Sequence, residues 1–310
     1  VEAFKETRKL LNDDGLICLS FWAMHPDLAK KLYLMLEEAF DGEAPVVYRT
    51  HHYGTAFLIG NKNIKTLQAQ YKTYPEITSN IIKNKSKVDI ATDNWPFFYM
   101  PKKVYPLSYI IMILLILIIS TFYVKNLSGI SFRNFSFPCF FLGAGFMLIE
   151  TKGITELSLY FGSTWIVISI VISAILIMAY FANLIILKMN TPSNNLIYFC
   201  LFISLLFGLI FTYIRNYLSI PFYFDQIFGT LFLTIPLFFS GFAFSYELKM
   251  ARSVMVALSS NIIGAMVGGC LEYNAMYFGF RSLYILAIFM YLFSFITSKN
   301  MNGIFIKKAG

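Results

Sequence analysis

The chain has 310 residues, of which 57% are hydrophobic and only 14% are charged, whereas an ordinary soluble domain carries about 25% charged residues. This composition excludes a purely soluble globular protein. The net charge of +8 is not gathered in basic stretches that alternate with aromatic residues, so a nucleic-acid-binding surface is excluded as well. The four cysteines are far apart and form no C-x-x-C pair, so the sequence indicates neither a zinc site nor a disulfide framework.

The charges divide the chain near Tyr105. Residues 1–104 hold 26 of the 42 charged side chains, and residues 105–310 hold the other 16 among long apolar runs. We therefore expect two domains, a soluble one over 1–104 and a transmembrane helical one over 105–310. The chain begins with Val1 rather than Met, within a stretch of helical pattern. We accordingly expect a missing N-terminal portion of the same protein.

Five elements are predicted in the soluble part: helices over 2–11 and from His25 onward, and strands over 16–21, 44–49 and 55–59. The continuous apolar run at 16–21 predicts a strand that is buried on both faces of a parallel sheet. The two later strands flank a turn at 51–54, and residues 62–91 read as a short helix and a surface loop. This order is typical of the end of an α/β sheet with an antiparallel hairpin at its edge.

The three histidines do not indicate a metal site. His51 and His52 are adjacent in a turn and cannot both face one ion in regular geometry. His25 is distant in sequence, and no carboxylate or cysteine is placed to complete a ligand set.

Seven apolar runs follow, which predict six or seven transmembrane helices in a lipid bilayer. The runs cover about 105–124, 135–149, 164–187, 196–214, 227–246, 253–278 and 282–297. The second run is short and ends in Glu150-Thr151-Lys152-Gly153, and residues 154–162 are amphipathic, as in a helix that lies in the membrane interface. Alternatively, 135–162 is one long broken helix.

The positive-inside rule favours one of these topologies. If all seven runs cross and the soluble part is cytosolic, then most basic residues face outside, which fits poorly. If 135–162 enters the membrane without crossing, Lys188, Lys249 and Arg252 join Lys102 and Lys103 on the cytosolic side. The second topology satisfies the rule better, with the soluble segment in the cytoplasm.

Glu272 is the clearest candidate for a functional group within the membrane. Ionisable residues in lipid cost at least about 2.5 kcal/mol each and usually face protein or water. Glu272 is in line with Ser260, Gly264 and Gly268 at intervals of four, which predicts a seam where another helix approaches closely, and Asn261 lies on the adjoining face. Glu272 is either a substrate or proton site or a structural carboxylate paired with a basic residue.

A second polar cluster comprises Glu150, Lys152 and Glu156. Lys152 and Glu156 are spaced as neighbours on one helix face and can pair. The cluster is either a polar gate at the membrane surface or an ordinary helix end at the headgroups.

Asp93 and Trp95 lie just before the first apolar run. An acidic residue followed by aromatics at this place can anchor a chain at the membrane interface, and we prefer that role to catalysis.

Several stretches resemble one protein family. Leu11-Asn12-Asp13-Asp14-Gly15-Leu16-Ile17 resembles the turn before a late strand of class I S-adenosylmethionine-dependent folds, and Thr92-Asp93-Asn94-Trp95-Pro96-Phe97-Phe98-Tyr99 resembles the closing stretch of that domain in polytopic bacterial spermidine synthase-like proteins. Three further stretches resemble the membrane signature of these proteins: residues 141–152 (FLGAGFMLIETK), 159–165 (LYFGSTW) and 261–273 (NIIGAMVGGCLEY). At Asn94 the family pattern usually has Asp.

The resemblance implies the C-terminal part of a Rossmann-like transferase domain joined to a bundle in the bacterial inner membrane. Such domains bind S-adenosylmethionine or its decarboxylated form and transfer a methyl or aminopropyl group to an acceptor. The family's cofactor loop and catalytic Asp precede the first residue here, so the resemblance assigns no cofactor-binding or catalytic residue in this chain. Two other functions stay open: a transporter of a polyamine or amphiphile, and a scaffold with a degenerate enzyme domain.

Overall fold

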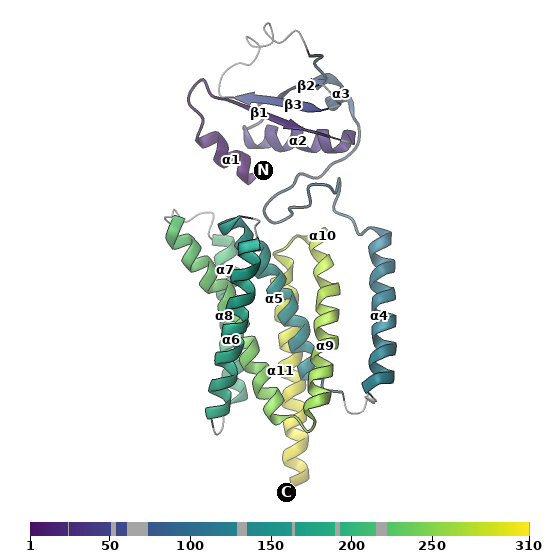
Figure 1. Ribbon diagram of the computed structural model, residues 1–310, viewed down its shortest axis with the longest axis vertical. Helices are drawn as coiled ribbons and strands as arrows, with labels where there is room; N and C mark the ends of the chain where they lie inside the picture. The colour runs from purple at the N-terminus through teal and green to yellow at the C-terminus, as the bar shows by residue number, and fades with distance from the viewer. Residues whose placement is uncertain are drawn as a thin grey trace. The chain divides into compact units, whose positions relative to one another are not determined.

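The computed structural model describes residues 1–23, 25–50, 54–60, 74–128, 135–162, 165–189, 193–214 and 222–309. It divides into two compact units, Val1–Val104 and Tyr105–Gly310, at the position where the charge content of the sequence drops. The first unit contains a small sheet with helices, and the second is built of helices (Figure 1).

The first unit follows the predicted order of elements. It comprises α1 (Glu2–Lys9), β1 (Leu16–Phe21), α2 (Pro26–Ala39), β2 (Val46–Arg49), β3 (Thr55–Gly60) and α3 (Thr78–Lys83). The predicted antiparallel hairpin is confirmed, because β2 pairs antiparallel with β3. Most of the predicted turn at 51–54 lies outside the described residues, as does 61–73.

The three strands are arranged in the order β1-β3-β2, and β3 is antiparallel to both of its neighbours. β1 and β2 therefore run parallel to each other, and α2 is the crossover that connects them. The core of the unit is formed by the apolar side of α2 and one face of the sheet, with Leu36, Phe40, Val47, Phe57 and Ile59 fully or almost fully buried. This crossover places the N-terminus of α2 beside the carboxyl end of β1.

The prediction for β1 is wrong in one respect. The strand pairs antiparallel with β3, and its alternate residues Leu16, Cys18 and Ser20 are exposed, whereas Ile17 and Phe21 pack on the core. An unbroken apolar run does not distinguish a strand buried on two faces from one buried on a single face. Within the described part of the chain, β1 has one buried face.

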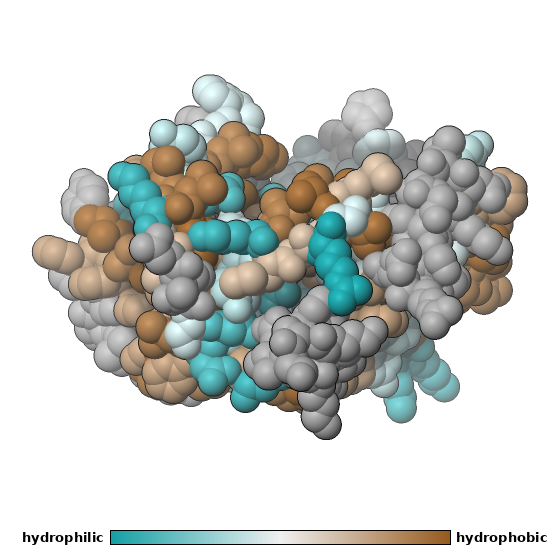
Figure 2. Space-filling model, turned by 90° about the horizontal axis from the view of Figure 1, so that it is seen from below, coloured by the Kyte–Doolittle hydropathy of each residue, from teal (hydrophilic) through white to brown (hydrophobic). Residues whose placement is uncertain are grey.

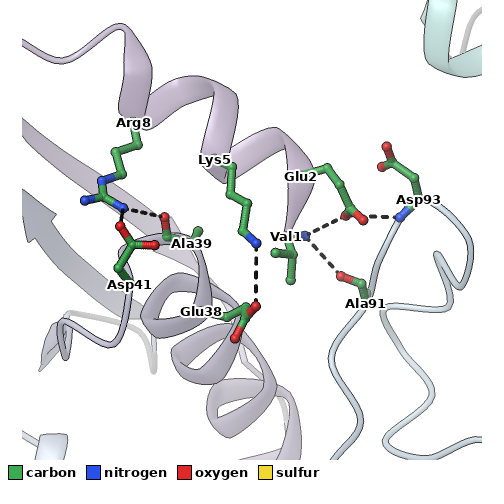
Figure 3. Close-up of polar contacts among 9 residues, drawn as sticks. All are labelled: Val1, Glu2, Lys5, Arg8, Glu38, Ala39, Asp41, Ala91 and Asp93. Atoms are coloured by element: carbon green, nitrogen blue, oxygen red, sulfur yellow. Dashed lines mark hydrogen bonds and ion pairs between the residues drawn. The ribbon is translucent and has the colours of Figure 1, made fainter. Parts of the chain in front are cut away.

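Polar contacts hold α1 against the rest of the unit (Figure 3). Arg8 donates to the Asp41 carboxylate at 2.5 Å and to the Ala39 carbonyl at 3.2 Å, both at the end of α2. At the other end of α1, the Glu2 carboxylate accepts a hydrogen bond of 3.1 Å from the backbone N–H of Asp93. These contacts connect α1 to two segments far away in the sequence.

Among the described residues of the second unit, six helices are long and apolar enough to cross a membrane. Its elements are α4 (Leu107–Ser128), α5 (Phe137–Phe161), α6 (Trp165–Lys188), α7 (Asn194–Ile214), α8 (Phe222–Met250), α9 (Val254–Leu271), η5 (Glu272–Asn274), α10 (Ala275–Phe278) and α11 (Ser282–Ala309). The six are α5 to α8, α9 with its short continuation to Phe278, and α11, and α4 has a shorter apolar stretch over Leu107–Tyr123. The chain is thus an integral membrane protein.

The prediction that 135–162 enters the membrane without crossing is wrong. These residues form the single continuous helix α5, which also absorbs the predicted interfacial helix at 154–162. The charged residues that suggested a helix end lie inside α5, where Lys152 is buried and forms an ion pair with Glu156. Because this pair satisfies both charges within the helix, the segment can continue through the bundle.

α5 is the central helix of the bundle and contacts α6, α8, α9 and α11 (Figure 1). The predicted small-residue seam is confirmed at its contact with α9. A Cβ atom at Gly264 would lie 1.9 Å from the Phe140 carbonyl oxygen, and one at Gly268 would lie 2.5 Å from that of Ala144. Ser260, one turn earlier, accepts a hydrogen bond of 3.1 Å from the backbone N–H of Ser136. Only glycine allows the two backbones to approach so closely.

One end of the bundle is basic. Lys188, Lys249, Arg252 and Lys299 are exposed where α6, α8 and the described part of α11 end and where α9 begins. Figure 2 views the molecule from this end and shows hydrophilic groups gathered towards the middle, with hydrophobic groups around them. Such a pattern fits a bundle surrounded by hydrocarbon with an end at the headgroups.

We predict that Gly264→Val destabilises the bundle by at least about 2 kcal/mol, because the new side chain overlaps the backbone of α5. Gly269→Val is the matched control, since a Cβ at Gly269 meets no atom within 4 Å. Thermal unfolding in detergent measures both variants. Equal losses of stability in the two variants would contradict the close contact of α5 and α9.

Candidate functional site

A cavity of about 570 Å³ lies in the first unit at the carboxyl ends of β1 and β2. Its lining residues include Trp22 after β1, Pro26 at the start of α2, Arg49 at the end of β2 and Thr55 at the start of β3. In α/β sheets, ligands bind outside the carboxyl ends of the parallel strands, near the N-termini of the following helices. The cavity thus lies at the carboxyl ends of two strands that run parallel and beside the N-terminus of α2.

The cavity is lined by polar groups as well as apolar ones. Arg49 contributes an exposed guanidinium, Thr55 a hydroxyl, and Asn80 and Asn84 amides, while Trp22 is 62% exposed and offers an indole face. A guanidinium and an aromatic ring that line one cavity suit a ligand that carries a carboxylate or phosphate and a flat or apolar part.

One wall of the cavity is stabilised by Asp27 in the first turn of α2. The Asp27 carboxylate accepts hydrogen bonds from the Ser86 hydroxyl at 2.5 Å and from the Asn84 amide at 3.2 Å. These hydrogen bonds, that of Ser86 first, lower the pKa of Asp27 below its usual value. The ionised carboxylate also lies at the positive end of the helix dipole, so it stabilises α2 where α2 borders the cavity.

Trp95 is buried inside the first unit and is 1% exposed, so it is not available as an anchor at the membrane interface. Its ring lies 4.3 Å from the Lys31 ammonium of α2, which donates to the carbonyls of Phe97 at 2.8 Å and Met100 at 2.7 Å. Asp93 is tied to α1 through its backbone N–H. The segment around Trp95 therefore closes the unit over α2.

The charged residues on α5 form two contacts. Lys152 and Glu156 pair with each other, with side chains 3% and 12% exposed, and Thr151 donates a hydrogen bond to the Glu272 carboxylate at the end of α9. Glu150 is close enough to Glu272 for their charges to interact. The structure thus brings Glu150 and Glu272, two of the candidates, together at one end of the bundle, with the Lys152–Glu156 pair on the same helix as Glu150.

Asn261 is placed elsewhere on the seam between α5 and α9. Its side-chain amide donates to the Cys139 carbonyl at 3.0 Å, and a Cβ at Gly143 would lie 2.2 Å from the Asn261 carbonyl oxygen. Asn261 holds α9 against the first turn of α5.

Sequence reasoning missed three residues that the structure makes important. The sequence pattern places Arg49 only at the end of a strand, and it gives no sign that Lys31, in the helix after His25, has no exposed surface. Glu247 was placed outside the apolar run over 227–246, yet it lies within α8, one of the six helices long enough to cross. The signal for Glu247 was the helical pattern that continues to Met250.

No family model, curated protein or solved structure matches this chain. The functional assignment therefore depends on the geometry of the chain itself and on the family resemblance of its motifs.

The buried Lys31 predicts a specific pH dependence. Burial lowers its pKa from 10.5 to about 8, and the charge of Asp89 opposes this shift. Between about pH 8 and 10.5 the unfolded chain still holds the proton that the folded chain has released, so folding stability rises with pH in this window, by roughly 3 kcal/mol.

Lys31→Met keeps the apolar stem and removes the titration, so it should abolish this rise. Unfolding of the first unit in the intact protein can be followed by the fluorescence of Trp22 and Trp95. If the wild type and the variant show parallel pH profiles, Lys31 does not titrate in this range.

Proposed function

We propose that the chain is the C-terminal part of a membrane-bound, S-adenosylmethionine-dependent transferase that resembles polytopic bacterial spermidine synthase-like proteins. It moves a methyl or aminopropyl group from S-adenosylmethionine or decarboxylated S-adenosylmethionine to an acceptor that binds in the cavity at the ends of β1 and β2. The observation that carries the proposal is the position of this cavity, beside the N-terminus of the crossover helix α2.

The connectivity of the sheet supports this function. β1, α2 and β2 form a strand, crossover helix and parallel strand, the unit from which Rossmann-like sheets are built, with β3 inserted antiparallel between the two strands. The outer edge of β2 is occupied by backbone hydrogen bonds. The backbone N–H of Arg49 donates to the Pro75 carbonyl, and the backbone N–H of Ile77 donates to the Val47 carbonyl. On its other side, β1 pairs with no strand among the described residues, so the sheet can be extended there by strands that bind the cofactor.

The lining of the cavity narrows the class of acceptor. Arg49 is the charged side chain among its described lining residues, so an acceptor with an anionic group is favoured over a polyamine. An amphiphile with a carboxylate or phosphate head satisfies Arg49 and can present its apolar part to Trp22.

The transferase predicts a specific loss of activity in Arg49→Ala. Transfer of label from S-adenosylmethionine or decarboxylated S-adenosylmethionine to membrane lipids and soluble acceptors should fall by about 10- to 100-fold, because a charge-assisted hydrogen bond is worth about 1.5–3 kcal/mol. Arg8→Ala is the control, since Arg8 contacts Asp41 on α1's side of the unit and does not line the cavity.

This assay uses a chain that includes the residues upstream of Val1. Calorimetry should detect cofactor binding to that longer chain and none to residues 1–310 alone. Tight binding by residues 1–310, or equal activity of both arginine variants, would contradict the proposal.

A second candidate, transport of a polyamine or amphiphile, is favoured by the distribution of basic residues. The positive-inside rule assigns the end with Lys188, Lys249 and Lys299 to the cytoplasm. Tyr105, at the start of α4, bonds Asn274 near the end of α9, which is the opposite end of the bundle. The rule thus places the residues that enter α4 outside, where no S-adenosylmethionine is supplied.

The numbers of basic residues on the two sides of α4 are equal, with Lys102 and Lys103 before it and Lys125 and Arg133 after its apolar stretch. Since the first crossing helix usually dominates orientation, these flanks leave a cytoplasmic first unit compatible with the sequence.

The transport candidate makes Glu272 a cation-binding residue. It predicts uptake of labelled spermidine into proteoliposomes that falls at least about tenfold in Glu272→Gln, because the neutral amide gives up the ionic attraction. Uptake that is unaffected by this change would leave Glu272 as a structural partner of Thr151, and absence of uptake would contradict the candidate.

A further inference from the structure

Glu247 is a largely enclosed acidic residue in the bundle, far along the chain from the α5 cluster. Its carboxyl group lies beside the hydroxyls of Ser298 on α11 and Tyr198 on α7. Its Oε1 atom is buried and has no hydrogen-bond partner among the described residues, and no ion pair to Glu247 is found in that part of the chain. An unpaired carboxylate in such surroundings is strongly disfavoured.

The hydroxyls around Glu247 form a chain with a defined direction. The Ser294 hydroxyl donates its single proton to the Pro138 carbonyl at 3.0 Å, since a carbonyl can only accept. The oxygen of Ser294 lies 2.7 Å from the Tyr198 hydroxyl, so the Tyr198 proton is the one shared between them. With its proton shared with Ser294, the Tyr198 hydroxyl offers the Glu247 carboxyl group no compensating positive charge.

The hydrogen bond between Asn194 and Ser298 leaves a second hydroxyl group available beside Glu247. Asn194 donates its amide hydrogen to the Ser298 oxygen at 2.8 Å, which leaves the Ser298 hydroxyl free to donate to Glu247. The Oδ1 atom of Asn194 is buried, and no donor to it is found within the described residues. Asn194 is the first residue of α7, so the row from Glu247 through Ser298 to Asn194 leads to the end of the bundle.

We propose that Glu247 is a proton-binding site inside the membrane bundle, with a buried carboxyl oxygen that has no partner among the described residues, and that it is reached from the end of α7 through Ser298 and Asn194. The ligand is a proton, and the site is independent of the cavity in the first unit. Glu247 can take up and release this proton without the loss of an ion pair within the described residues.

The other titratable groups near the site are identified. Cys139 on α5 and Tyr198 on α7 are close enough to interact with it, Tyr291 on α11 interacts with Tyr198, and none of these is a cation. Lys249, on α8 itself, donates instead to the carbonyls of Ile186 and Met189. Across the bundle, α6 has Lys188 in its last turn and the described α9 has Cys270 at its far end.

Infrared spectroscopy of the full chain in lipid vesicles at neutral pH tests the proposal. Glu247→Gln should remove one carbonyl-stretch band of a protonated carboxylic acid, and Tyr198→Phe should keep this band but shift it to higher frequency. Glu6→Gln is the control that should leave the band unchanged, because Glu6 is an exposed carboxylate paired with Lys9. If folded Glu247→Gln loses no acid band, or loses carboxylate bands instead, the proposal is wrong.

A second measurement does not depend on the folding of a variant. Dicyclohexylcarbodiimide reacts with protonated carboxyl groups in apolar surroundings, and mass spectrometry of the wild-type protein locates the adduct. We expect labelling on Glu247 that falls at least tenfold as the pH is raised far enough to ionise it. Absence of an adduct on Glu247, with labelling confined to other carboxyl groups, would overturn the proposal.

Discussion

The close approach of α5 and α9 is the contact on which the membrane unit depends. In hydrocarbon, helices gain no hydrophobic stabilisation from each other, so their association relies on tight packing and on hydrogen bonds between helices. Gly264 and Gly268 let the two backbones touch, and Ser260 and Asn261 add hydrogen bonds to the first turn of α5. With α9 fixed on one side, α5 presents its other sides to α6, α8 and α11.

The polar residues of the bundle are divided between its two ends according to how their charge is compensated. At the end of α9, Thr151 bonds the Glu272 carboxylate, and on α5 the basic Lys152 is matched by Glu156. Near the start of α7, Glu247 is surrounded by hydroxyl groups and has no basic partner among the described residues. The first arrangement supplies partners for the charged groups, and the second leaves a carboxyl oxygen of Glu247 without a partner among the described residues.

Much of the fold could be predicted from the sequence because its signals are local. The charge drop near Tyr105, the strand at Leu16–Phe21, the hairpin and the seam of small residues all follow from patterns within a few turns or one strand. The errors arise where contacts with other parts of the folded chain decide the structure. A charged stretch on α5 resembled a helix end because the sequence shows that Lys152 and Glu156 can pair but not that the pair is buried inside the bundle, and the cavity around Arg49 needs four segments to meet.

The proposed transferase requires the first unit to act on a cytosolic cofactor, so the decisive measurement is the side of the membrane on which this unit lies. Cys18 is exposed on β1, whereas Cys139 is buried in the bundle, so Cys18 is a natural reporter. A membrane-impermeant maleimide should fail to label the protein in intact cells and should label it after permeabilisation, and Cys18→Ser should abolish that signal. Labelling of Cys18 in intact cells would place the unit outside and would contradict the transferase.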